Sequence, residues 1–310
     1  MIKADSNIRI SNRIRLGAGD VAFNIVNFFV FGVFTLICIY PFYYILINSI
    51  SDNHQSALGN VIFWPMGIHF SNYVEVMKLK GIGRAAMISV ARTAGGTVCT
   101  VLASAVLGYL FTKKRMWGRR FWYRFIVITM YFNAGIIPWF IVMYNLGLMN
   151  NFLAYILPGI VSPFFIILVK TYIESVPPSL EESAAIDGAG FWTILTRIII
   201  PLIIPILATI TIFSAVGQWN YFIDTLFLMP KKENWTLQFI LYNYLNNSTS
   251  LSTLLKTAQG STMATDVSKL QTPTSVRMTI TIVVVFPVLL VYPIFQRYFI
   301  KGIMIGAVKG

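Results

Sequence analysis

The sequence predicts an all-α integral membrane protein with six transmembrane helices, and three observations support this fold class. Of its 310 residues, 56% are hydrophobic and only 11% are charged, and the mean hydropathy is +0.71. A soluble domain usually carries about 25% charged residues. The apolar residues gather in runs long enough to cross a hydrocarbon core about 30 Å thick. Basic residues lie in short runs beside these apolar segments.

Six apolar segments form the predicted transmembrane domain, which covers residues 21–297. The expected spans are roughly 21–49, 86–111, 123–147, 151–173, 198–222 and 278–297. The first span follows a basic segment, residues 1–20. Its apolar run is too long for a secretory signal, whose apolar region has about 7 to 15 residues. We therefore expect a first membrane helix after a cytoplasmic N-terminal segment.

The distribution of Lys and Arg predicts the orientation of the chain. Most of the 24 basic residues lie in four segments: 1–20, 112–124, 170–197 and the residues after 296. Because Lys and Arg concentrate in cytoplasmic loops, both termini are predicted to be cytoplasmic, with 298–310 as a tail. This pattern accounts for the net charge of +13 without a nucleic-acid partner.

Two long segments, 50–85 and 225–277, then become external loops. The later part of the second loop is polar, which is typical of a flexible loop or of a surface that docks a soluble partner. Both interpretations remain open at this point.

The predicted spans lack the residues that an ion-coupled carrier needs. No Asp or Glu lies within them, whereas such carriers bury acids or ion sites at mid-membrane. Apart from basic residues at span ends, Arg92 is the only charge, and we expect it to reach the outer interface. The chain also lacks the phosphate-binding G-x-x-x-x-G-K-[ST] loop. Uphill transport would therefore take its energy from another polypeptide.

A polar stretch, PPSLEESAAIDGAGFW at 177–192, interrupts the apolar sequence. Pro177 and Pro178 should end the preceding helix. Ser179 stands three residues before Glu182, a capping-box spacing that predicts the start of a short cytoplasmic helix. Four residues fall near one face of this helix: Leu180, Ala184, Gly188 and Phe191. The face is small in its middle and bulky at its end. The aromatic rings would fill a cleft in another protein or pack on the chain's own spans.

The same stretch resembles the EAA loop of binding-protein-dependent ABC importer permeases. The matching residues are Glu182-Ser183-Ala184, Asp187-Gly188-Ala189 and Ile200-Pro201, with Ser183 where Ala is usual. The sequence resembles carbohydrate-type permeases, including the maltose-permease type, at four further places. These are Phe70-Ser71-Asn72-Tyr73, Gly108-Tyr109-Leu110, Gln218-Trp219-Asn220 and the tail YFIKGIMIGAVKG.

This resemblance implies a type I ABC importer permease fold in a bacterial cytoplasmic membrane. The implied partners are a second homologous permease, two ATPase subunits, an extracellular solute-binding protein and membrane lipid. ATP and Mg²⁺ would be bound by the ATPases, with no cofactor or metal in this chain. The implied cargo is an oligosaccharide or sugar. The alternatives are an importer permease for a non-sugar solute and an ion-coupled carrier. A membrane-embedded enzyme would need a nucleophile–base pair, and none is evident.

The resemblance assigns 174–197 as a coupling loop that docks an ATPase. The coupling residues would be Leu180, Glu181, Glu182, Ala184, Asp187, Gly188 and Phe191. Glu182 would pair with a basic group of the ATPase or cap its own helix. Gly188 would let the backbone approach the partner.

Aromatic and amide side chains near the spans are candidates for the substrate pathway, because sugar sites combine ring faces with polar groups. The candidates are Tyr131, Asn133, Trp139, Trp219, Asn220 and Tyr221. The amides of Asn133 and Asn220 would need a partner at membrane depth. Aromatic belts at the membrane interface produce the same residue types, so both interpretations stand.

Overall fold

A computed structural model describes residues 17–79, 81–246 and 274–290, and in these ranges the chain is helical without any β-strand. The segments 1–16, 247–273 and 291–310 lie outside the described residues. The predicted N-terminal segment, most of the second external loop and the tail motif fall largely within them.

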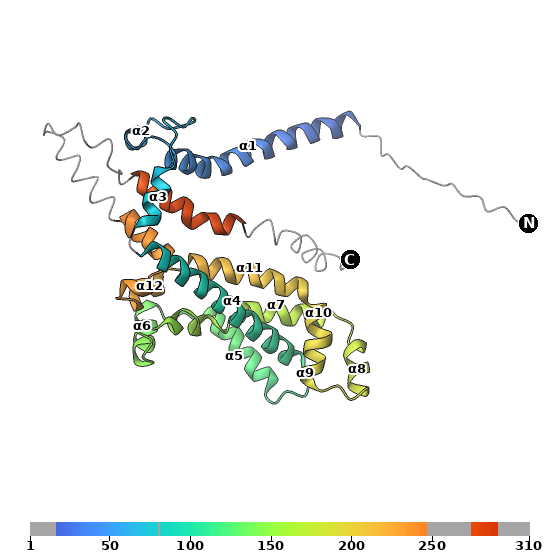
Figure 1. Ribbon diagram of the computed structural model, residues 1–310. Coiled ribbons are helices and arrows are strands. Elements are labelled where there is room, and N and C mark those ends of the chain that lie inside the picture. Colours follow the sequence, from blue (N-terminus) through green and yellow to red (C-terminus); the bar gives the residue numbers. More distant parts are fainter. Residues whose placement is uncertain (1–16, 80, 247–273, 291–310) are drawn as a thin grey trace, which may run out of the picture.

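The first helix, α1 (Ala18–Ser49), extends away from the rest of the molecule (Figure 1). Most of its apolar side chains are exposed, and only its C-terminal end is packed. There, the buried Asn48 amide donates hydrogen bonds to the carbonyls of Tyr44 and Val61. Short helices α2 (Asn53–Leu58) and α3 (Ser71–Lys78) follow. An apolar helix with so little packing needs lipid or another subunit around it.

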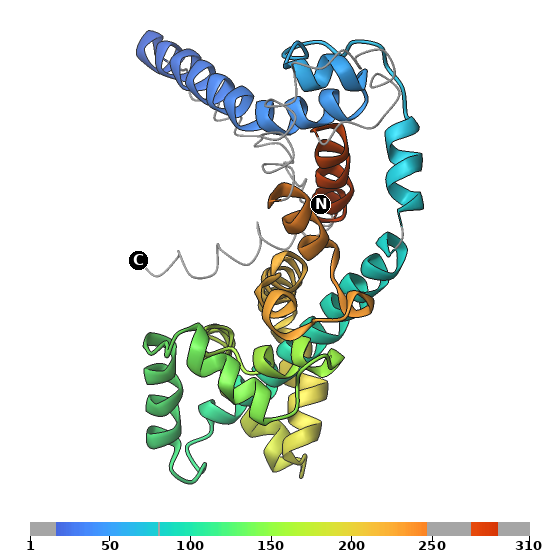
Figure 2. The ribbon, with the colours of Figure 1, turned by 90° about the vertical axis from the view of Figure 1, so that its left-hand side faces the viewer.

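The centre of the fold is α4 (Ile82–Thr112), which packs mainly against α11 (Ile204–Asn220) and α7 (Pro163–Glu174). Both views show α3 at one end of α4, with α2 beyond it, and α8 to α10 at the other end (Figures 1 and 2). Small residues permit this close packing. A Cβ atom added at Gly108 would lie 2.7 Å from Cγ1 of Val169 on α7.

Prolines or short irregular stretches interrupt three of the predicted spans. The predicted span 123–147 is divided into α5 (Arg119–Tyr131) and α6 (Ile136–Asn145). The predicted span 151–173 contains the 3₁₀ turns η1 (Phe152–Tyr155) and η2 (Leu157–Gly159) before α7, with a bend of 46°. Proline has no backbone N–H and blocks continuation of the preceding turn, and Pro158 and Pro163 lie at the interruption of this span, 151–173.

The predicted span 198–222 is bent by 81° and begins earlier than expected. It comprises α9 (Phe191–Ile194), the π-helical η3 (Leu195–Ile199), α10 (Ile200–Leu202) and α11. Pro201 and Pro205 stand in the first turns of α10 and α11. The predicted coupling loop therefore contains two elements, namely α8 (Ser179–Ile186) and the start of this bent helix.

By length and composition, two described helices can cross a membrane: α1 from Gly19 onward, and α4. The number rises to four when each bent pair counts as one span. Two further apolar helices, α6 and Thr274–Leu290, are shorter. The six-span topology and the orientation of the termini remain predictions.

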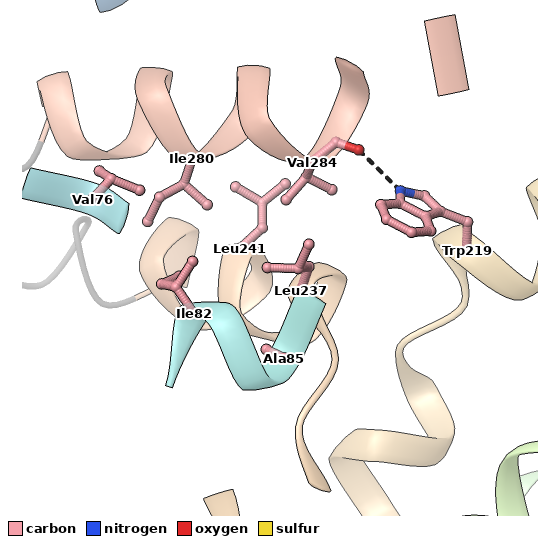
Figure 3. Close-up of a cluster of buried hydrophobic side chains, with 8 residues drawn as sticks. All are labelled: Val76, Ile82, Ala85, Trp219, Leu237, Leu241, Ile280 and Val284. Atoms are coloured by element: carbon pink, nitrogen blue, oxygen red, sulfur yellow. Dashed lines mark hydrogen bonds between the residues drawn. The ribbon is translucent and has the colours of Figure 1, made fainter. Parts of the chain in front are cut away.

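Buried apolar side chains form three clusters along the molecule. The first joins α3, the start of α4, Trp219 and the helices over 237–246 and 274–290 (Figure 3). In it, the indole N–H of Trp219 donates to the Val284 carbonyl at 2.9 Å. The second surrounds Tyr109 and joins the ends of α4 and α7 to α9–α11. The third joins α6, η1 and α12 (Ile223–Leu228), and a turn, η4 (Lys232–Asn234), follows it.

Candidate functional site

The short helix α8 ends in a glycine-dependent turn. Gly188 has φ +81°, and its N–H donates to the Ala185 carbonyl, while the Ala189 N–H donates to the Ala184 carbonyl. This pair of bonds is a Schellman motif, in which the left-handed position strongly favours glycine. The Asp-Gly pair of the EAA motif therefore has a local structural role, which is to end α8 and turn the chain toward α9.

One face of α8 and the start of α9 pack on their own chain. Ala184, Ala189 and Phe191 lie against the cluster around Tyr109. The rings of Phe191 and Tyr109 are 4.9 Å apart between centroids. Of the two positions left open for the aromatic rings, Phe191 takes the internal one, and Trp192 remains 63% exposed.

An ion pair ties α8 to the end of α4. Lys113, the residue after α4, pairs with Glu181, and its ammonium lies 3.7 Å from the centroid of the Tyr109 ring. Tyr109 also contacts Phe191. The end of α4 therefore holds the segment at two places, at Glu181 in α8 and at Phe191 in α9.

The outward face of the segment carries exposed apolar side chains. Ile186 is 86% exposed, and Leu180 is 45% exposed. The acids Glu182 and Asp187 are also exposed. The expected capping box is not formed, because Pro178 occupies the N-cap and no side chain caps α8. Of the two roles expected for Glu182, the structure does not show the capping of its own helix.

A buried ion pair joins α4 to α12. The Arg92 guanidinium contacts both carboxylate oxygens of Asp224, at 3.0 and 2.7 Å, and both side chains are almost fully buried. It also donates to Gln218 Oε1 and the Tyr221 carbonyl and lies 4.7 Å from the Tyr155 ring centroid. The expectation that Arg92 reaches the outer interface is wrong, because these partners satisfy its charge inside the fold.

Burial raises the pKa of the Asp224 carboxyl to about 6, and the neighbouring Arg92 charge opposes that rise. Desolvation disfavours the carboxylate, while the guanidinium stabilises it.

This ion pair lies at the wall of a pocket of about 530 Å³ between α4, the η1–η2 segment, α7 and α11. Two of the predicted pathway residues, Trp139 and Tyr221, line it together with Tyr155 and Gln218. Flat rings beside hydrogen-bonding groups are suited to the apolar faces and hydroxyls of a sugar.

The other four predicted pathway residues lie elsewhere. Tyr131 is 81% exposed at the end of α5, and Asn133 accepts a hydrogen bond from the Gly135 N–H in the break before α6. Trp219 belongs to the first apolar cluster, and Asn220 is exposed at the end of α11. The amides of Asn133 and Asn220 are expected to need a partner at membrane depth, and for Asn133 the structure shows this local bond to Gly135.

Sequence reasoning missed the charged part of the pocket. Asp224 falls just beyond the predicted span 198–222, so it was not identified from the sequence as the partner of Arg92. A charge in an apolar run is nevertheless a signal of a functional position, and its partner is the residue to search for. Among the described residues, no group of three His, Cys, Asp or Glu side chains is placed to hold a metal ion.

Comparison with known proteins finds similarity to transport proteins over most of the chain. Residues 100–305 match the family described as binding-protein-dependent transport system inner membrane component. The chain is 31% identical over 278 residues to the polygalacturonan/rhamnogalacturonan transport system permease protein YtcP of Bacillus subtilis (strain 168), covering 90% of this chain and 95% of YtcP. It is 32% identical over 293 residues to protein LplC of the same organism, covering 94% and 96%.

A solved structure is similar over most of the fold. It is a crystal structure of a bacterial ABC transporter involved in the import of the acidic polysaccharide alginate. The TM-score is 0.79 and the identity 32%, covering 91% of this chain and 98% of the other.

Proposed function

The chain belongs to the family of binding-protein-dependent transport system inner membrane components, and on this premise we propose that it is one of two permeases in an ATP-driven oligosaccharide importer. It is a transport subunit and not an enzyme. ATP and Mg²⁺ would bind to two ATPase subunits, and an extracellular solute-binding protein would deliver the cargo. The chain would cross the bacterial cytoplasmic membrane six times, with both termini in the cytoplasm.

The observation that carries the proposal is the two-sided character of α8. On the inward side, α8 is joined to the end of α4 through the Glu181–Lys113 pair. The adjoining α9 is joined to the same end through the Tyr109–Phe191 contact. On the other, outward side, Ile186 of α8 is exposed, as is Trp192 of α9. Exposed apolar side chains beside polar ones are typical of a docking site. We assign this outward face to a cleft of an ATPase, whose closure would move α8 and, through Lys113, the end of α4.

Co-purification tests this assignment most directly. The chain is tagged, extracted in mild detergent and analysed by mass spectrometry. An ATPase with a phosphate loop and a second permease with its own EAA segment are the expected partners. A chain that emerges alone after crosslinking would refute the proposal and return the ion-coupled carrier to consideration.

The pocket beside Arg92 is our candidate for part of the substrate pathway. YtcP is named for polygalacturonan and rhamnogalacturonan, and the similar solved structure concerns alginate. Carboxylate-bearing oligosaccharides are therefore the first cargo to test. Within this pocket Asp224 neutralises Arg92, so we expect the pocket to contribute ring and hydrogen-bond contacts rather than charge selection.

Two tyrosines offer a matched test of the pathway. In vesicles containing the whole transporter, Tyr221→Ala should lower ATP-driven uptake, because Tyr221 lines the pocket. Tyr131→Ala removes the same side chain from an exposed position outside it and should leave uptake unchanged. Equal effects would remove the pocket from the pathway. Stimulation of the ATPase by neutral oligosaccharides alone would refute the acidic cargo.

A further inference from the structure

A second polar pocket, of about 850 Å³, lies between the α4–α5 turn and α7. Four cationic side chains line it: Lys114, Arg119, Arg120 and Lys170. Three of them come from the basic run KKRMWGRR, and the fourth comes from α7, more than 40 residues along the chain. The tertiary fold therefore converts a linear basic run into a concave site.

The cations of this pocket exceed the acids near them. Glu174 pairs with Lys170 at 2.7 Å and lies 4.0 Å from Arg119. Among the described residues, neither Lys114 nor Arg120 is paired with a carboxylate. The Lys170 ammonium also lies 4.9 Å from the Tyr123 ring centroid, which holds it at the pocket wall. The pocket thus contains at least two cations that no described carboxylate neutralises, Lys114 and Arg120. A third cation, Lys170, is held beside them.

Exposed aromatic side chains lie near the pocket in the sequence. Trp117 is 85% exposed, Phe121 64% and Trp122 40%. The pocket also lies beside the end of α4, which is long and apolar enough to cross a membrane. Exposed rings and cations at the end of such a helix are typical of the membrane interface.

We propose that this pocket binds a phosphate-bearing anion, and that its occupant is the headgroup of an anionic phospholipid. Arginine and lysine bind phosphate oxygens through charge-assisted hydrogen bonds. Basic pockets between membrane helices on the cytoplasmic side are suited to anionic headgroups. The exposed rings favour a lipid over a free anion, because they would lie against its glycerol and acyl region. This site does not depend on the assignment of α8 to an ATPase.

The test counts the lipids retained by the intact transporter. The complex is released from nanodiscs of phosphatidylcholine containing increasing fractions of phosphatidylglycerol, and bound lipids are counted by native mass spectrometry. Lys114→Gln and Arg120→Gln should each weaken phosphatidylglycerol retention about fivefold, since a basic residue near an anionic surface contributes about 1 kcal/mol. The control is Arg115→Gln, which removes the same charge from the same turn but does not line the pocket.

Three results would overturn the proposal or change the source of the anion. An equal loss with Arg115→Gln would refute a pocket and indicate general attraction to the membrane. Unchanged lipid retention together with weaker ATPase co-purification would assign the pocket to an acidic protein surface. Inorganic phosphate that binds in pure phosphatidylcholine nanodiscs, with the same dependence on Lys114 and Arg120, would make a free anion the ligand and refute the lipid headgroup.

Discussion

Replacement of Ile186 tests the coupling assignment without disturbing the fold. The side chain is 86% exposed, so the permease alone loses almost nothing when it is shortened. If an ATPase cleft covers it, Ile186→Ala removes about three buried carbon groups at roughly 0.8 kcal/mol each. Allowing for incomplete burial, the loss is about 2 kcal/mol, or about thirtyfold in the dissociation constant of the ATPase.

The assay measures two quantities on the same protein. The affinity of purified ATPase for the permease is titrated in detergent, and thermal unfolding of the permease is followed separately. Ile186→Ala should weaken affinity and leave unfolding unchanged. Ile194→Ala changes the same residue type at a 5% exposed position in the second cluster, and should lower stability by about 2–5 kcal/mol.

A matched exposed control separates docking from general hydrophobicity. Ile128 on α5 is 64% exposed, and Ile128→Ala should change neither affinity nor stability. If Ile186→Ala binds the ATPase as tightly as the parent protein, the outward face of α8 is not the docking surface, and the reasoning from its exposure fails.

Substitutions at three further places, namely Gly188, the Arg92–Asp224 pair and Gly108, test the geometry. Gly188→Ala should cost about 1–2 kcal/mol of stability because of its left-handed φ, and Gly188→Asn less, as judged by thermal unfolding; equal values would contradict the Schellman turn. Arg92→Met or Asp224→Leu should each destabilise by about 3–5 kcal/mol, whereas the double variant Arg92→Met/Asp224→Leu should lose less than the sum; additive losses would argue against a direct pair. Gly108→Val should separate α4 from α7 and reduce folded yield in the membrane, because even its Cβ would lie 2.7 Å from Val169; normal yield would refute this close approach.

Features of short stretches of sequence determine much of what identifies the class of this protein. The hydropathy of the runs predicts membrane helices, and the positions of α1 and α4 agree closely with the predicted spans 21–49 and 86–111. The stretch 177–192 predicts α8 because helix-forming residues lie between two prolines and a glycine turn. These features depend on neighbours within a few residues, which is why the sequence alone suffices for them.

Interruptions within spans were harder to predict. Membrane helices tolerate Pro and Gly, so Pro158, Pro201 and Pro205 did not by themselves indicate where a span would bend. The bends of 46° and 81° depend on which neighbouring helices receive the redirected segment.

The sequence by itself determined the membrane class, the helical content, the position of α8 and the family resemblance, because each rests on local periodicity, composition or a continuous motif. Only the tertiary structure decided which side chains meet. Arg92 and Asp224 are 132 residues apart, and their pairing depends on the packing of α4 against α11 and α12. It also decided that Phe191 faces inward while Ile186 faces outward, because that choice depends on where Tyr109 and Lys113 lie at the end of α4. Contacts between distant segments arise only when the chain folds.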